Sequence, residues 1–478
     1  MTIAMVPMDP GEKAAGVDQA KAEGFSEDAL ARAFVGEHVG QLRFCHSRGK
    51  WLEFDGAIWR EDKRRRAFDY ARRSIREAGA GAKFGKAAAA SGVEQFARAD
   101  PLLSACADDW DPDPFLLGTP DGAVDLRTGK VLPADHAFML TRSTSVTPQE
   151  GEATLWKEFL MQASGGDLEL IRFLQQIAGY SLTADTREHA LFFIHGPGGN
   201  GKGVFLNTFT QILGDYAVTA AMETFIASRN DRHSTELAVL RGARLVTASE
   251  TEEGRSWAES RIKQMTGGDP ITARFMRQDN FTFLPAFKLV IIGNHEPVLR
   301  NVDEAMRRRF HIVPFNHKPP KVDRTLEARL RAEHPRILRW MIDGCLDWQA
   351  SGLVRPASVV RQTDRYFEEQ DLLGQFLADR CETGGDLFDT TASLFAAWEK
   401  YAHAAGEYPG KQKAFGSALR KRGFKPDRLA NVERTRVYRG VRLMLPMDDL
   451  GQVAGATAVA GAGHAGAAHP LDDREMPP

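Results

Sequence analysis

The sequence contains few cysteines, no long apolar run and almost no net charge. Its 478 residues include four cysteines, which lie far apart and form no C-x-x-C pair. A disulfide framework or a zinc ribbon would need closer, paired spacing, so we expect four reduced thiols in a cytoplasmic protein. No apolar stretch approaches the roughly 18 residues that span a bilayer, which argues against a membrane protein. The N-terminus also lacks the basic segment and apolar core of a secretory signal.

Charge is balanced over the whole chain but not along it. Lysine and arginine number 62 and aspartate and glutamate 64, a net charge of −2 that gives no sign of a nucleic-acid partner. Residues 411–443, however, hold eleven cations and two acids, a local charge of +9. Residues 60–86 hold ten cations and four acids, a local charge of +6. Such patches neutralise phosphates, although a solvated helix face explains residues 60–86 equally well.

The pattern of apolar residues favours an α/β protein. Residues 190–316 alternate strands, loops and helices and contain three apolar strands, as in a parallel sheet covered by helices. Aromatic strands that turn at Asp55-Gly56 predict a hairpin over residues 51–59. Apolar residues at helical spacing predict helices within residues 153–180 and 321–350.

The most basic segment has the pattern of a small DNA-binding domain. Apolar residues at helical spacing mark two short helices within residues 394–419, and residues 434–445 alternate as in a hairpin. Helix, helix and basic wing predict a winged-helix domain, whose cations would contact phosphates. The candidate DNA contacts in this domain are Lys421, Arg422 and Arg436.

The strongest local signal is the glycine-rich segment His195-Gly-Pro-Gly-Gly-Asn-Gly-Lys-Gly203. It follows an apolar strand at residues 191–194 and precedes an amphipathic helix at residues 204–213. Glycines in this context let backbone N–H groups wrap phosphate oxygens, and the helix N-terminus adds its positive dipole end. A glycine-rich turn with an incidental lysine is the structural alternative. The predicted P-loop consists of Gly196, Pro197, Gly198, Gly199, Asn200, Gly201, Lys202, Gly203 and Val204, with Lys202 reaching the β- and γ-phosphates.

Magnesium ligation is the weak point of this pattern. Gly203 occupies the position where a Ser or Thr usually ligates Mg²⁺, so we expect water to replace that hydroxyl. Downstream, an apolar strand ends at Glu250, and Glu252 follows two residues later. A carboxylate there can hold Mg²⁺ through water and polarise the attacking water, which makes Glu250 the main candidate. An acidic surface turn is the plain alternative.

Two further polar features follow at the spacing of an ATPase. An apolar strand at residues 288–293 ends at Asn294, whose amide could hold the lytic water or sense the γ-phosphate. Three consecutive arginines then occur at residues 307–309. A guanidinium that reaches a neighbouring subunit's γ-phosphate is an arginine finger. A turn asparagine and a solvated basic helix end are the structural alternatives.

Five motifs occur in a characteristic order. They are Gly-Pro-Gly-Gly-Asn-Gly-Lys-Gly (196–203), Ala-Ser-Glu-Thr-Glu-Glu-Gly (248–254), Met-Thr-Gly-Gly-Asp-Pro-Ile-Thr-Ala-Arg (265–274), Gly-Asn-His-Glu-Pro (293–297) and Met-Arg-Arg-Arg-Phe-His-Ile-Val-Pro-Phe (306–315). Together they resemble the superfamily 3 helicases, most of all the phage/plasmid and poxvirus primase–helicase branch, over about residues 35 to 445. The resemblance implies an AAA+-like core that assembles as a ring, usually a hexamer, hydrolyses ATP between subunits and translocates on DNA.

The resemblance assigns roles by position. It makes Lys202 the Walker A lysine and Glu250 the main Walker B acid, with Glu252 as a second acid. Asn294 matches sensor 1, and Arg308 or Arg309 matches the arginine finger, with Arg309 favoured.

It also implies two DNA-binding features in the core. The segment Thr266-Gly-Gly-Asp269, together with Lys263, matches a motif specific to this superfamily. Residues 274–283 should form a hairpin that projects into the ring channel and turns at Gln278-Asp279-Asn280. Arg274 and Arg277 are its nearest cations, and a structural hairpin with solvated arginines is the alternative.

Composition and resemblance together predict seven segments and a helicase without a primase domain. Only about 30 residues precede the helicase-associated region, far fewer than a polymerising domain needs. The segments are a disordered N-terminus (1–29), a helicase-associated domain (30–150), a helical joint (151–189), the ATPase core (190–318), a helical lid or linker (319–365), the winged-helix domain (366–446) and a disordered tail (447–478).

The expected function is an ATP- and Mg²⁺-dependent DNA helicase of phage, prophage or plasmid replication, in the cytoplasm of a bacterial host cell. Its expected partners are single-stranded DNA in the ring channel, the duplex at the fork and further copies of the chain. A separate primase or replication initiator is another candidate partner. The alternative is a P-loop ATPase that serves as an origin-recognition or loading switch and binds DNA without unwinding it.

Overall fold

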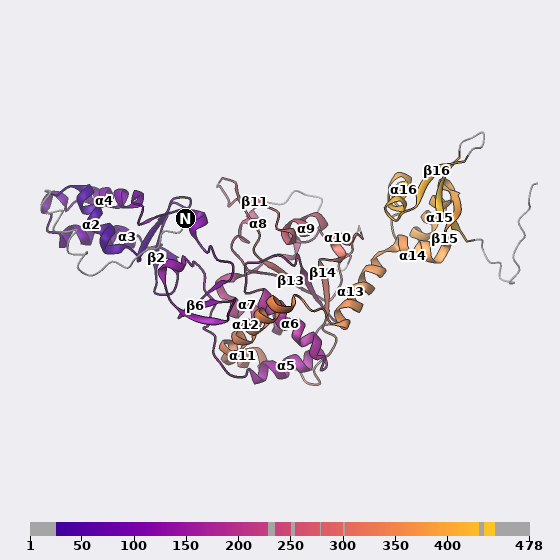
Figure 1. Ribbon diagram of the computed structural model, residues 1–478, viewed down its shortest axis with the longest axis horizontal. Helices are drawn as coiled ribbons and strands as arrows, with labels where there is room; N and C mark the ends of the chain where they lie inside the picture. The colour runs from indigo at the N-terminus through magenta and orange to yellow at the C-terminus, as the bar shows by residue number, and fades with distance from the viewer. Residues whose placement is uncertain are drawn as a thin grey trace, which may run out of the picture. The chain divides into compact units, whose positions relative to one another are not determined.

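The computed structural model describes residues 25–227, 235–249, 254–277, 279–299, 302–429 and 435–444. Glu250, Glu252, the turn residue Gln278 and the tail expected at residues 447–478 lie outside these ranges, as does most of the expected N-terminal segment. Two compact units make up the chain, one ending at Gln370 and the other beginning at Asp371 (Figure 1). No described helix is long and apolar enough to cross a membrane.

Three helices and a four-stranded sheet form the N-terminal part of the first unit. The sheet order is β3-β2-β1-β4, and β2 and β3 form the predicted hairpin, with Phe54 opposite Trp59. Helix α3 buries Ala67, Ala71 and Ile75 in this core and exposes its arginines. The elements are α2 (Glu27–His38), β1 (Leu42–Cys45), β2 (Lys50–Phe54), β3 (Trp59–Glu61), α3 (Arg66–Glu77), α4 (Ala87–Ala99) and β4 (Ser104–Ala105).

A small antiparallel sheet follows, made of β5 (Leu116–Thr119), β6 (Gly122–Asp125) and β7 (Lys130–Pro133). Gly122 has a φ of 147°, and a Cβ there would lie 2.3 Å from the Leu132 carbonyl oxygen, so this turn requires glycine. The buried guanidinium of Arg244 donates to the Leu116 carbonyl oxygen over 2.7 Å. This bond ties the small sheet to the core of the same unit.

Five parallel strands form the central sheet, in the order β14-β8-β13-β10-β9. The three predicted apolar strands are β8, β10 and β13, which confirms the predicted α/β class. The sequence pattern missed the other two strands. Strand β9 is short and partly exposed, and a histidine interrupts the apolar residues of β14. The bounds are β8 (Leu191–His195), β9 (Ala217–Thr219), β10 (Leu245–Ser249), β13 (Lys288–Gly293) and β14 (Phe310–Pro314).

Helices cover both faces of this sheet, because alternate strand residues point to opposite sides. Phe192 and Ile194 of β8 pack among α5 (Thr154–Ser164), α6 (Leu168–Tyr180), α7 (Lys202–Leu213) and α12 (His334–Ser351). Leu191 and Phe193 pack among α9 (Glu259–Gly267) and α13 (Ala357–Gln370). Figure 1 shows α6, α7 and α12 on one side of the sheet and α9 on the other. The helices predicted within residues 153–180 and 321–350 are therefore confirmed.

The remaining elements of the first unit are short. Strands β11 (Ile271–Ala273) and β12 (Phe281–Phe283) pair antiparallel as a hairpin. Its first strand precedes residues 274–283, where the sequence predicts the hairpin, so the prediction is right about the hairpin and too short at its start. The other helices are α8 (Thr235–Ala238), α10 (Glu304–Arg307) and α11 (Leu326–Leu330). Turns of 3₁₀ helix occupy Ala82–Phe84, Ala107–Asp109, His136–Phe138, Gly214–Tyr216, Met222–Thr224 and Arg331–Glu333.

The second unit combines three helices with a three-stranded antiparallel sheet of order β15-β17-β16. Leu394, Trp398 and Phe415 form its buried core, as their helical spacing predicts. The hairpin expected within residues 434–445 is wrong in its position, because that stretch contributes one strand, which pairs with residues 425–428. The elements are α14 (Leu372–Arg380), β15 (Cys381–Thr390), α15 (Thr391–Ala404), α16 (Gln412–Lys421), β16 (Lys425–Arg428) and β17 (Arg436–Leu443).

Candidate functional site

A glycine-rich loop joins β8 to α7 at the carboxyl edge of the central sheet. Gly198, Gly199 and Gly201 have φ values of 45°, 71° and 88°, which side chains rarely allow. A Cβ on Gly196 would lie 2.0 Å from the Phe315 carbonyl oxygen, so the loop also needs glycine for close approach to β14. Asn200, 2% exposed, donates its side-chain amide to that same carbonyl oxygen. These glycine positions therefore require glycine, either for their backbone conformation or for close approach.

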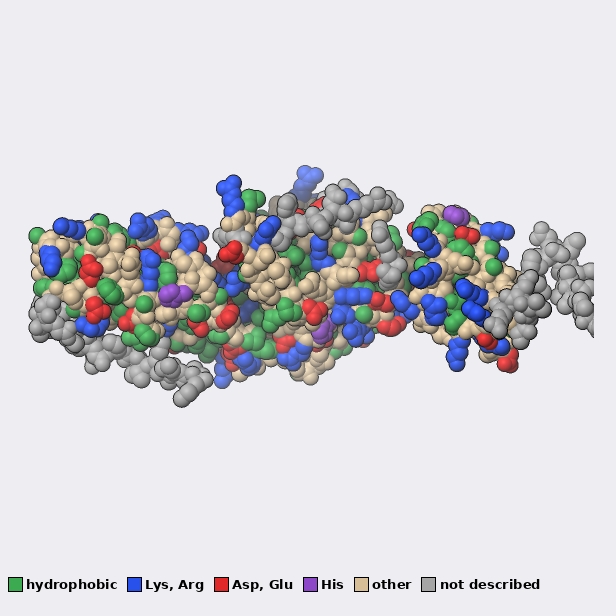
Figure 2. Space-filling model, turned by 90° about the horizontal axis from the view of Figure 1, so that it is seen from above, with side chains coloured by type: hydrophobic (Ala, Val, Ile, Leu, Met, Phe, Trp, Pro, Cys, Tyr) green, Lys and Arg blue, Asp and Glu red, His purple; other side chains and the backbone are tan. Residues whose placement is uncertain are grey.

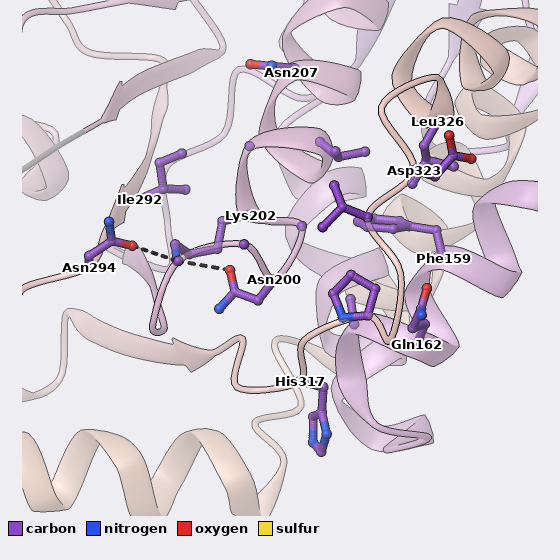
Figure 3. A pocket seen from close by; sticks show the side chains of 18 of the residues that line it. Phe159, Gln162, Asn200, Lys202, Asn207, Ile292, Asn294, His317, Asp323 and Leu326 are labelled. Carbon is purple, nitrogen blue, oxygen red and sulfur yellow. Dashed lines mark hydrogen bonds between the residues drawn. The ribbon is translucent and has the colours of Figure 1, made fainter.

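Lys202 begins α7 and turns back toward the loop. Its Nζ donates to the Gly196 carbonyl oxygen (2.6 Å), to Oδ1 of Asn200 (3.0 Å) and to Oδ1 of Asn294 (3.0 Å) (Figure 3). The side chain is 7% exposed, and burial lowers the pKa of Lys202. No carboxylate of the described residues pairs with it. A buried ammonium held by neutral oxygens alone is a site for an anion.

The predicted partner Asn294 lies beside the loop because its strand is the neighbour of β8. Strands β8 and β13 run parallel, with His195 opposite Gly293, so their carboxyl ends meet. The Oδ1 of Asn294 faces Lys202, and Nδ2 has no hydrogen-bond partner among the residues that the structure describes. Strand β10 also ends at this edge, at Ser249. The predicted acids Glu250 and Glu252 follow Ser249 directly but lie outside the described residues.

A cavity of about 780 Å³ opens above the loop and has two chemically different walls. Figure 3 shows Lys202, Asn200 and Asn294 on one side and Phe159, Leu326 and Asp323 on the other. A phosphate chain suits the polar wall and a flat base the apolar wall. The sequence pattern missed the second wall. It consists of Phe159 from α5, Val322 from the segment before α11, and Leu326 from the start of α11.

Gly203 faces open space, which bears on magnesium binding. No described atom outside its own helix and neighbours lies within 4 Å of a Cβ built on Gly203. A hydroxyl would therefore fit where the usual pattern has one. Among the described residues, no group of three or more His, Cys, Asp or Glu side chains could hold a metal ion.

The three arginines at the end of α10 differ sharply in their surroundings. Arg309 is 8% exposed and donates from Nε to Thr266 Oγ1 (3.2 Å) and from Nη1 to the Ala305 carbonyl oxygen (2.7 Å). Arg307 pairs with Asp364 over 3.3 Å. Arg308 is exposed and makes no ion pair or side-chain hydrogen bond within the described part of the chain. This placement favours Arg308 as the residue free to reach a neighbour, in place of the Arg309 that the sequence favours.

The residues of the superfamily motif also bind within their own unit. Lys263 pairs with Asp303 over 2.5 Å, at the N-terminus of α10. Thr266 donates to the Ile262 carbonyl oxygen (2.7 Å) and accepts the bond from Arg309. These contacts join α9 to the arginine segment, so Lys263 acts there as a structural cation.

The β11–β12 hairpin carries the features predicted for a nucleic-acid contact. Arg274 and Arg277 are both exposed in its loop, and Arg277 has a φ of 62°. Between them lie Phe275 and Met276, which the sequence reasoning overlooked, and Met276 is 76% exposed. The available signal was a pair of adjacent apolar residues between two arginines, close to an expected turn.

The basic segment of the second unit is only partly neutralised by its own acids. Arg422 pairs with Asp371 and Arg439 with Asp427, and Arg439 holds the pKa of the Asp427 carboxyl below its usual range. Lys and Arg side chains gather over this unit in Figure 2. Of the predicted DNA contacts, Lys421 and Arg436 are exposed without an ion pair to any described residue, whereas Arg422 is engaged. The exposed cations in the described part of residues 411–443 are Lys411, Lys413, Arg420, Lys421, Arg422, Lys425, Arg428, Arg436, Arg439 and Arg442.

The basic patch near α3 is more strongly paired. Arg66 binds Glu53 over 2.8 Å, and Arg72 and Arg73 both bind Asp69 over 2.6 Å. This pairing supports the solvated-face interpretation of residues 60–86.

Comparison with known proteins adds two domain matches. Residues 28–165 match the family described as D5 N terminal like, and residues 194–309 match a family of unknown function, DUF5906. A solved structure, the apo A form of the NrS-1 C-terminal region, aligns with 86% of this chain and 99% of its own, at 10% identity and a TM-score of 0.48.

Relatives occur among viruses. The chain is 22% identical over 294 residues to "Putative helicase L207/L206" of Acanthamoeba polyphaga mimivirus, a match covering 56% of this chain and 31% of that protein. It is 24% identical to "Putative helicase 022R" of Frog virus 3, covering 52% and 28%. It is 22% identical to "Putative primase C962R" of African swine fever virus, covering 56% and 31%. The chain thus spans about a third of the length of these relatives. The two domain matches and the viral relatives support a phage and viral primase–helicase family for this chain, at distant identity.

Proposed function

We propose that the chain is an ATP-dependent DNA helicase of phage or viral replication, built on an AAA+-like core. The observation that carries the proposal is the contact of Lys202 with the loop and with Asn294 at the mouth of a two-walled cavity. A lysine that ends among backbone and amide oxygens beside a helix N-terminus is the arrangement that cradles phosphates. Relatives named as helicases and a primase support the replication setting.

In this proposal the two walls divide the nucleotide between them. The loop amides and Lys202 hold the phosphate chain, while Phe159 and Leu326 flank the base. Asn294 keeps its Nδ2 for the attacking water or the γ-phosphate. Mg²⁺, when bound, neutralises the phosphate charge, and Glu250 is the residue proposed to hold it through water. Because Gly203 has no side chain and faces open space, there is room for such waters.

Hydrolysis is proposed to take place between subunits of a ring, for which a hexamer is the expected form. Arg308 is the proposed finger because it is exposed next to the tethered Arg309. The β11–β12 hairpin and the basic second unit, proposed to be a winged-helix domain, are the DNA contacts. A bacterial host and a primase or initiator partner remain predictions.

The competing function is an ATPase that binds DNA as an origin-recognition or loading switch. The exposed basic surface of the second unit suits either function. An assay of strand displacement from a forked duplex distinguishes the helicase from the switch. The helicase requires ATP-dependent displacement by the wild-type chain and none by Lys202→Ala. Lys157→Ala, which alters an exposed lysine paired with Glu152, is the matched control and should unwind normally. DNA-stimulated hydrolysis without displacement would favour the switch.

A further inference from the structure

His195 is the last residue of β8 and bridges to the segment after β13. Its Nε2 lies 3.1 Å from the Asn294 carbonyl oxygen, and its Nδ1 lies 3.3 Å from Oε1 of Glu296. Both side chains are largely buried, with 20% and 13% of their surfaces exposed. The bridge therefore joins the strand that leads into the glycine-rich loop to the main chain of Asn294.

The two contacts of His195 place its imidazole between two oxygen atoms. The Asn294 carbonyl oxygen can only accept, so Nε2 carries the proton of that hydrogen bond. One shared proton joins Nδ1 to Oε1 of Glu296, whichever of the two atoms holds it.

Helix α13 provides the far anchor of the bridge. Oε1 of Glu296 also accepts from Nε2 of Gln362 over 3.3 Å. The hydroxyl of Tyr366 donates to the Pro297 carbonyl oxygen over 2.5 Å, and the Leu299 N–H donates to Oε1 of Gln370 over 3.0 Å. These three α13 residues recur one helical turn apart, so one face of the helix holds residues 296–299.

The consequence falls on the side chain of Asn294. Its main chain is held through His195, and its Oδ1 accepts from Lys202. Because the main chain and the Oδ1 of Asn294 are both held, its Nδ2 can donate in only one direction. A positioned amide contributes to a transition state only when its direction is fixed beforehand.

We propose that His195 and Glu296 are positioning residues of the nucleotide site, whose bridge orients Asn294 against Lys202. The role in hydrolysis rests on the proposed function, whereas the bridge itself does not. Neither residue touches the nucleotide in this account, since neither lines the cavity. Loss of the bridge should therefore slow turnover and leave ATP binding intact.

The test uses Glu296→Leu and His195→Phe, which remove the bridge, and Glu296→Gln as the conservative control. A neutral His195 can still donate from Nε2 and accept at Nδ1 from the new amide, so the Gln variant retains both bonds. The readouts are kcat and KM for ATP, and amide hydrogen exchange of residues 294–299 without nucleotide.

We expect the Leu and Phe variants to lose at least about tenfold in kcat, with KM within about twofold, and to exchange these amides at least about tenfold faster. The Gln variant should stay within about threefold of wild type in each measurement. Unchanged exchange in both bridge-breaking variants overturns the proposal, as does a rise in KM equal to the loss of kcat. If the wild-type chain hydrolyses no ATP, the proposed function fails, and the exchange measurement still decides whether the bridge holds Asn294.

Discussion

The side chain of Lys202 ends among three neutral oxygens, which belong to Gly196, Asn200 and Asn294. Burial lowers its pKa, and no acid of the described residues pairs with it, so a bound anion would be stabilised there. A phosphate chain on the loop would provide that anion and raise the pKa again. Nucleotide binding at this site should accordingly stabilise the fold.

Gly203→Ser should improve magnesium use, because the serine hydroxyl enters open space at the usual ligand position. We expect the Mg²⁺ concentration for half-maximal hydrolysis to fall severalfold. Replacing a helical glycine should also stabilise the fold by about 0.5 kcal/mol. Titration of hydrolysis with Mg²⁺ is the measurement. Gly199→Ser is the control, because its φ of 71° makes a side chain costly and should impair activity. An unchanged magnesium requirement in Gly203→Ser would refute the account of the missing hydroxyl.

Arg308→Ala should leave folding intact and reduce hydrolysis by about a thousandfold or more, the range found for arginine fingers. Its side chain makes no bond within the described part of the chain that the substitution could break. Mixing Arg308→Ala with Lys202→Ala subunits should restore part of the activity, because some interfaces then combine two intact halves. Hydrolysis rates across mixing ratios provide the measurement.

Arg309→Ala is the matched comparison. It removes the bonds to Thr266 and Ala305, so it should lower the thermal midpoint as well as activity. Recovery on mixing with Arg309→Ala but not with Arg308→Ala would reverse the assignment.

At the scale of elements, the strands β8, β10 and β13 could be predicted because each is a continuous apolar run that leads into a candidate site residue or loop. Strand β9 could not, since its three residues owe their conformation to pairing with β10. The apolar wall of the cavity was missed for a related reason. Phe159 and Leu326 lie more than 150 residues apart, and only the tertiary fold brings them to one cavity. The choice between Arg308 and Arg309 likewise depends on burial, which consecutive identical residues do not reveal.

The hairpin between β11 and β12 offers a test at this scale. Phe275→Ala with Met276→Ala should abolish the stimulation of hydrolysis by single-stranded DNA and reduce unwinding about tenfold, since an aromatic side chain on which a base stacks contributes about 1–3 kcal/mol. Met161→Ala removes an exposed apolar side chain of α5 and serves as control. Normal stimulation in the double variant would assign the hairpin a structural role.

At the scale of the whole molecule, net charge was a poor guide. The value of −2 averages over a basic second unit and acids elsewhere. The paired arginines of α3 show that a basic stretch alone also says little, because Asp69 and Glu53 engage three of its arginines in ion pairs. Placement of the acids decides which patch remains open to phosphates.

Stability should fall in mild acid because of His311, which is buried in β14 and stacks on Phe192. Burial lowers the pKa of His311 to about 3 from 6.5, so only the unfolded chain takes up the proton between those values. Full stability is present above pH 6.5 and is lost as the pH falls toward 3. From pH 7 to pH 5 the loss should be about 2 kcal/mol.

Denaturant unfolding at the two pH values measures this loss. His311→Phe keeps the aromatic contact and should remove most of the difference, whereas His403→Gln, at an exposed position, should not. An unchanged difference in His311→Phe would show that other groups dominate.

The central claim is that Lys202 and Asn294 form the site at which DNA-dependent ATP hydrolysis takes place. Steady-state hydrolysis by the purified chain, with and without single-stranded DNA, tests it most directly. The account predicts hydrolysis that DNA stimulates and that Lys202→Ala reduces by at least about a hundredfold, with Lys157→Ala unaffected. Hydrolysis that survives Lys202→Ala would contradict it.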